Sequence, residues 1–150
     1  MKKLLKGFLI FVVVCFIIGY FFGYILSSLP KLSYTAKAFL FTLSTEHYDE
    51  AYKMLTPDFQ KRVNLEQFKS TVQSTNLNKF RDVIWIKPDV YTDERSGYTV
   101  GVVYTTSNTK FVVQFDFSLI EAQPKQMRWE INNISFPDQY NEEMQALPSP

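Results

Sequence analysis

The feature that most constrains this chain is an uncharged stretch near its N-terminus. No acidic or basic residue lies between Lys6 and Lys31, and residues 8–29 read FLIFVVVCFIIGYFFGYILSSL. As a helix rising 1.5 Å per residue, this stretch would be about 33 Å long, enough to cross a hydrocarbon core of about 30 Å. We therefore expect a transmembrane helix at 8–29, preceded by a short cytoplasmic N-terminus at 1–7.

A cleaved signal peptide is the alternative for this segment. Signal peptides have an apolar core of roughly 7–15 residues followed by small residues at the cleavage site. The core here is longer and its exit reads LSSLPK, which favours a permanent anchor. Lys2, Lys3 and Lys6 favour a cytoplasmic N-terminus. The sequence thus predicts a single-pass protein of the cytoplasmic (inner) membrane whose C-terminal part is periplasmic or extracellular.

Small residues recur every four positions along the predicted membrane helix. Such a ridge lets two helices approach closely, as in GxxxG pairs. Chance spacing is the alternative, because glycine is common in membrane helices. The ridge allows a homodimer or a helical partner within the bilayer, in addition to lipid. Its members are Cys15, Gly19, Gly23 and Ser27.

The composition of the remaining part excludes several classes of function. Three of the 16 lysines and arginines precede the uncharged stretch and none of the 15 acids does, so the rest carries a charge of about −2. Nucleic-acid binding needs clustered basic charge, so we expect no such partner. One histidine and one cysteine cannot build a His/Cys metal site. Phosphate-binding loops need clustered glycines, and only Gly97 and Gly101 lie in this part. We expect no cofactor and no metal.

Helical spacing in this part gives way to strand spacing. Apolar residues at i, i+3, i+4 and i+7 predict a helix over 32–43 and a shorter one over 48–55. A short turn over 56–63 follows, and a third helix starts at Asn64. From 83 onward the period is two, with predicted strands at 83–86, 98–104, 111–119 and 127–136. The last strand slips at Asn132-Asn133, which predicts a β-bulge. About three helices packed on a curved four-strand antiparallel sheet would form an α+β fold.

One segment carries a family resemblance. Residues 44–68, STEHYDEAYKMLTPDFQKRVNLEQF, resemble the first helical region of NTF2-like (cystatin-like superfamily) envelope proteins. The resemblance implies an NTF2-like cone over 32–136 in a single-pass bacterial envelope protein. NTF2-like enzymes similar to ketosteroid isomerase use a carboxylate and a tyrosine inside the cone, and no such pair of this chain maps onto that pattern. The matching residues are Tyr48, Ala51, Tyr52, Leu55, Thr56, Pro57 and Phe59.

Aromatic residues of the helices and strands are candidates for the lining of a ligand pocket. Apolar concave sites are the usual places where small ligands bind. The alternative is ordinary core packing in a domain without disulfides. The pocket candidates are Tyr52, Phe59, Phe68, Trp85, Tyr104, Phe115 and Trp129, with Phe117 beside them.

The opposite sheet face should also be partly apolar. Such a face is a candidate for docking a protein, unless the residues after 136 cover it. We expect 137–150 to be a loose, flexible tail because it is polar and contains late prolines. The sheet-face candidates are Ile84, Ile86, Val103, Val112 and Ile120.

No side chain stands out as catalytic. His47 follows the apolar stripe of the first helix, where a histidine is more often structural than a general base. Asp116 should point away from the helices. The sequence therefore favours a non-enzymatic interaction or assembly module, anchored in the membrane and bound to another protein or to a second copy. The alternative is a small-ligand-binding protein or an NTF2-like enzyme that uses the aromatic pocket.

Overall fold

The computed structural model describes residues 31–122 and 126–148. The predicted N-terminus at 1–7 and membrane helix at 8–29 lie outside these residues, and so does the small-residue ridge of Cys15, Gly19, Gly23 and Ser27. Among the helices of the described ranges, none has the length and apolarity needed to span a membrane.

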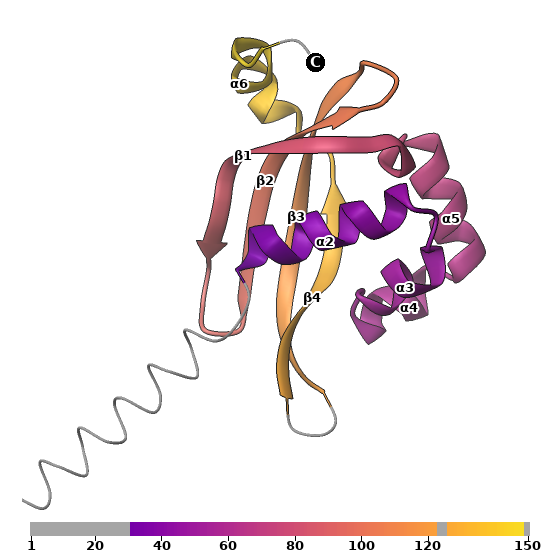
Figure 1. The fold of residues 1–150 in the computed structure, drawn as a ribbon. Coiled ribbons are helices and arrows are strands. Elements are labelled where there is room, and N and C mark those ends of the chain that lie inside the picture. Colours follow the sequence, from indigo (N-terminus) through magenta and orange to yellow (C-terminus); the bar gives the residue numbers. More distant parts are fainter. Residues whose placement is uncertain (1–30, 123–125, 149–150) are drawn as a thin grey trace, which may run out of the picture. The chain divides into compact units, whose positions relative to one another are not determined.

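Four antiparallel strands form a single sheet in the order β1-β2-β3-β4 (Figure 1). They are β1 (Phe80–Tyr91), β2 (Ser96–Thr105), β3 (Lys110–Ala122) and β4 (Gln126–Ser135). The predicted α+β class with a four-strand meander is thus confirmed. The predicted bulge is confirmed too, because Asp116 pairs with Asn133 while Phe117 pairs with Ile131, which leaves Asn132 without an opposite residue.

The first strand extends further than its alternation predicts. The sequence predicts a strand at 83–86, but β1 continues through Pro88 to Tyr91. Proline cannot donate a ladder hydrogen bond, yet an edge strand tolerates it at a bulge. Indeed, β1 lies at the sheet edge and its pairing with β2 shifts on both sides of Lys87.

Helices cover one face of the sheet. Figure 1 shows α2 (Leu32–Ser44) lying across the strands, with the shorter helices gathered beyond its C-terminal end. The stretch 56–63, expected as a turn, contains a helix of its own, capped by Thr56, whose side chain accepts a hydrogen bond from the Phe59 amide at 3.3 Å. The shorter elements are α3 (Tyr48–Lys53), α4 (Pro57–Arg62), α5 (Leu65–Ser74) and the 3₁₀ turn η1 (Leu77–Lys79).

A capping box starts α5 at Asn64, where the sequence predicts that the third helix begins. The Gln67 amide donates to Oδ1 of Asn64 at 2.9 Å, and the Asn64 amide donates to Oε1 of Gln67 at 3.0 Å. Both bonds satisfy amides that have no partner within the helix.

We expect Asn64→Ala to lower the free energy of unfolding by about 1 kcal/mol, because the capping hydrogen bond is lost. The measurement is a urea titration of the full chain in detergent. Asn64→Asp, which keeps the acceptor, should stay within about 0.5 kcal/mol of wild type; equal losses in the two variants would contradict the capping role.

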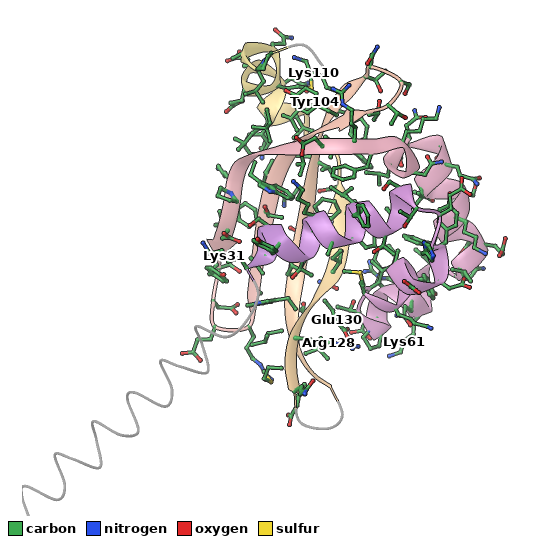
Figure 2. The ribbon with its side chains drawn as sticks, viewed as in Figure 1. Lys31, Lys61, Tyr104, Lys110, Arg128 and Glu130 are labelled. Carbon is green, nitrogen blue, oxygen red and sulfur yellow. The ribbon has the colours of Figure 1, made fainter. Side chains whose placement is uncertain are left out.

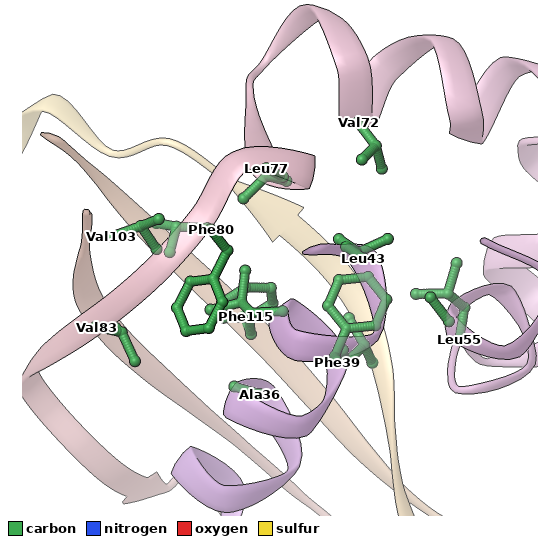
Figure 3. Packing of buried hydrophobic residues seen from close by; sticks show 14 of the residues in the cluster. Ala36, Phe39, Leu43, Leu55, Val72, Leu77, Phe80, Val83, Val103 and Phe115 are labelled. Carbon is green, nitrogen blue, oxygen red and sulfur yellow. The ribbon is translucent and has the colours of Figure 1, made fainter. Parts of the chain in front are cut away.

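The main core lies between the helices and the sheet (Figure 3). Phe39 of α2 is fully buried at its centre, with its ring centroid 5.9 Å from that of Phe115 on β3 and 6.2 Å from that of Phe68 on α5. Alternating residues of β3 place Phe115 and Phe117 in this core and Asp116 on the other sheet face, as predicted.

The opposite sheet face carries a second, smaller core, which corrects the expectation of a flexible tail. The chain end is not a loose tail in its described part: residues 138–140 form a 3₁₀ turn, η2 (Asp138–Tyr140), and residues 141–146 form α6 (Asn141–Ala146). Tyr140 is buried there, and Met144 and Leu147 pack beside it. The chain itself therefore covers this face in part, which is the alternative to a docking face that the sequence left open. The sheet residues of this core are Val100, Val102, Tyr104 and Val112.

Candidate functional site

Two recesses lie on either side of Phe136, which follows the last residue of β4. The Phe136 side chain is 42% exposed, and its ring centroid lies 5.8 Å from that of Phe111 on β3. Ile134, two residues earlier, packs against the helix-side core. Because side chains alternate along a strand, Phe136 continues the apolar row of β4 just beyond the end of the sheet.

The first recess, between α4, α5 and the end of β4, has a volume of about 100 Å³. Thr71 supplies the only hydroxyl in its lining, and its Oγ1 already donates to the Gln67 carbonyl at 2.9 Å. The recess is thus apolar and suits one aliphatic or aromatic side chain. Pockets for drug-sized ligands usually measure about 300–1,000 Å³, well above this volume. Its lining is Phe59, Val63, Phe68, Thr71, Val72, Leu77, Ile134 and Phe136.

The second recess, about 120 Å³ in volume, lies between β3 and the C-terminal helix. Lys110 forms one side of it, and its Nζ donates to the carbonyls of Met144 at 2.9 Å and Leu147 at 3.0 Å. The ammonium thus binds carbonyls near the end of α6, where the helix dipole favours a positive charge. Its lining is Lys110, Phe111, Val112, Phe136, Pro137, Asp138, Asn141 and Met144.

The seven predicted pocket residues do not line one cavity. Phe59 and Phe68 border the first recess. Tyr52 packs behind Phe68, with 5.6 Å between ring centroids, and its hydroxyl donates to the carbonyls of Gln60 and Val63. In the same helix-side core, Phe115 is fully buried, Trp129 is almost so and Trp85 is packed at its border.

Tyr104 lies on the other side of the sheet from those residues. It belongs to the second core, and its hydroxyl donates to the Pro148 carbonyl at 3.2 Å. Figure 2 shows it close to Lys110, near α6. The expectation that Tyr104 joins the aromatic set is therefore wrong. Every residue from Val100 to Thr105 is buried, so the alternation of β2 does not distinguish its faces.

The predicted sheet-face set is also divided. Val103 pairs with Val83 and belongs to the helix-side core, which corrects its assignment to the opposite face. Val112 lies in the second core, and Ile86 packs against it. Ile84 is exposed and Ile120 is half-buried. The structure thus does not bring the five residues together into one exposed patch.

Sequence reasoning missed a buried carboxylate on β4. Glu130 is only 3% exposed, and its Oε1 accepts hydrogen bonds from the Arg128 guanidinium, 2.7 Å from Nε (Figure 2). Its Oε2 has no hydrogen-bond partner among the described residues. Arg128 and Glu130 share a face because they are two residues apart on a strand. That spacing of a basic and an acidic residue was the sequence signal that could have predicted the pair.

A polar recess of about 260 Å³ surrounds the only histidine. His47 precedes α3 and is exposed, with 2.9 Å between its Nδ1 and Thr45 Oγ1. Lys69 also lines this recess, and its Nζ pairs with Oε1 of Glu66 at 3.3 Å. Within residues 31–122 and 126–148, no three His, Cys, Asp or Glu side chains are placed to hold a metal.

Three groups of the described part have shifted pKa values. A hydrogen bond to Tyr140 raises the pKa of Lys87, and burial raises the pKa of Tyr91. A hydrogen bond from Ser96 lowers the pKa of Asp93 in the turn between β1 and β2. All three lie away from the first recess.

Comparison of the chain with known protein families and with curated proteins finds no match.

Proposed function

We propose that this chain is a single-pass, non-enzymatic interaction module, anchored by residues 8–29, whose extracytoplasmic domain binds a polypeptide across Phe136. The observation that carries the proposal is the exposed Phe136 ring between two recesses. A ring exposed beside an apolar hollow gives an incoming side chain contact on several sides, as anchor residues require at protein interfaces. The partner presents one aliphatic or aromatic side chain that fills about 100 Å³.

An NTF2-like architecture fits this proposal. The segment that carries the resemblance forms α3 and α4, followed by a four-strand meander packed on the helices. Tyr52 and Gln60 tie α3 to α4, because the side-chain Nε2 of Gln60 donates to the carbonyls of Tyr52 and Leu55 at 3.0 and 2.9 Å. This corner holds Phe59 at the wall of the first recess. A rigid wall favours binding because little order has to be gained in the complex.

The test is photo-crosslinking of the full chain in its native membranes. We place benzoylphenylalanine at Phe136 and, as a position control, at Glu94 in the exposed turn between β1 and β2. We expect one discrete adduct from position 136 and none from position 94. An adduct of twice the chain's mass would identify a second copy as the partner.

A second substitution tests whether formation of the adduct depends on the first recess. Thr71→Trp should cover the first recess and reduce the adduct at least about tenfold, because the partner's side chain loses its cavity. Gln73→Trp, also exposed on α5 but outside the recess, should leave the adduct unchanged. Equal adducts in both variants, or equal labelling from positions 136 and 94, would contradict the proposal.

A further inference from the structure

The first helix of the domain has a second apolar face that the fold does not use. Tyr34 is 75% exposed and Phe41 is 63% exposed, the two highest values among the exposed large apolar side chains of the described residues. They are seven residues apart, about two helical turns, so they lie on one face. Ala38, between them on that face, is also exposed. The opposite face packs into the core through Leu32, Ala36, Phe39, Leu40 and Leu43.

Two lysines lie close to this outward face in the sequence, Lys31 before the helix and Lys37 within it. At about 100° per residue, Lys37 lies about 60° to one side of Tyr34. Lys31 is the N-cap residue, one position before the helix begins. Lys37 pairs with Asp82 at 3.3 Å, but both side chains are more than half exposed, so the pair holds the lysine only weakly. Aromatic rings flanked by lysines are typical of helices that lie at a membrane–water interface.

The chain before α2 indicates what covers this face. The predicted membrane segment ends at Leu29, and only Pro30 and Lys31 separate it from Leu32. Three extended residue steps span at most about 11 Å. Lys31 has an extended backbone (φ −62°, ψ 151°), so α2 begins at Leu32. If residues 8–29 cross a bilayer, α2 starts within about 11 Å of its surface.

We propose that α2 lies along the outer surface of the phospholipid bilayer, with Tyr34 and Phe41 inserted at the interface and Lys31 and Lys37 facing lipid phosphates. The inference rests on the anchor in the proposed function. In this arrangement α6, which packs on the other face of the sheet, points away from the lipid.

The test uses the full chain in vesicles of phosphatidylcholine and phosphatidylglycerol. The chain has a single cysteine, so Cys15→Ser gives a background for labelling. Nitroxide labels are placed at Phe41→Cys and, as a control, at Gln145→Cys, which is exposed on α6. Power saturation then measures how often each label collides with oxygen, which concentrates in the bilayer, and with a water-soluble nickel complex.

We expect collisions with the nickel complex to be at least about fivefold fewer at position 41 than at position 145, and collisions with oxygen to be more frequent. An interfacial helix buries its apolar face by about 5–10 Å, which places the label below the phosphates. Equal nickel collisions at the two positions would overturn the inference. Few collisions with both reagents, together with spin–spin broadening that disappears on dilution with unlabelled protein, would overturn it in favour of a second copy.

Vesicle flotation distinguishes a failure of this inference from a failure of the proposed membrane anchor. A chain that floats with the vesicles after an alkaline wash, but has a water-exposed label at position 41, rejects only the placement of α2. A chain that does not float rejects the anchor, and the placement of α2 with it.

Discussion

Phe39→Ala should lower the free energy of unfolding by about 3–5 kcal/mol, whereas Phe41→Ala should change it by less than about 0.5 kcal/mol. The two phenylalanines lie two residues apart on α2, but Phe39 is fully buried and Phe41 is 63% exposed. Loss of the Phe39 ring removes its contacts with Phe68 and Phe115 and leaves a cavity between helix and sheet (Figure 3).

The measurement is a urea titration of the full chain in detergent, followed by tryptophan fluorescence. Both tryptophans, Trp85 and Trp129, lie in the domain, so the signal reports unfolding of that part. A domain of this size is stable by about 5–15 kcal/mol, so the loss in Phe39→Ala is a large fraction of the total. Similar midpoints for the two variants would contradict the assignment of the two faces of α2. A neutral Phe41→Ala would also show that this ring is not needed for folding.

Several elements could be predicted because local chemistry decides them. The capping box at Asn64 and the bulge opposite Asp116 depend on residues within a few positions of each other. The strand β3 could be predicted because its faces differ in polarity: Phe115 and Phe117 face the helices, and Gln114 and Asp116 face the other way.

The two faces of β2 could not be assigned from the alternation of polar and apolar residues. Val102 and Val103 are both fully buried, one in each core, so alternation carries no information about which side meets the helices. The second core exists because Tyr140, near the end of the described chain, packs against β2 and β3. Such contacts join residues far apart in the sequence, so local patterns do not predict them. A six-residue helix such as α6 has little stability of its own, so the composition of 137–150 alone favoured a tail.

The Phe136 site was only partly visible in the sequence. Phe59 and Phe68 could be selected as aromatic candidates, but the recess between them also needs η1 and the end of β4. How far a strand continues past its last ladder pair depends on the turn that follows, here at Pro137. The exposure of Phe136 therefore follows from the tertiary structure and not from its place in the apolar alternation.

Gly101→Val should lower the free energy of unfolding by about 3 kcal/mol, although valine has the higher strand propensity. A Cβ at Gly101 would lie 2.6 Å from Cε3 of Trp85 and 2.7 Å from Cγ2 of Val83. Both side chains belong to β1, which is paired to β2 at this point. The indole of Trp85 therefore occupies the space above the glycine, and a larger residue must displace the ring or separate the strands. At an open position in a strand, the same change would stabilise the protein.

The control for Gly101→Val is a double-mutant cycle with Trp85→Leu. Truncation of the indole removes the closest contact, so Gly101→Val should cost at least about 1 kcal/mol less in the Trp85→Leu background than in the wild type. Urea titrations of the four proteins, followed by circular dichroism because one fluorophore is lost, give the coupling free energy. Equal costs in the two backgrounds would mean that the indole does not pack on Gly101. A smaller cost in the Trp85→Leu background would instead show that the indole of Trp85 fills the space that Gly101 leaves. Through this contact the edge strand β1 packs against the inner strand β2.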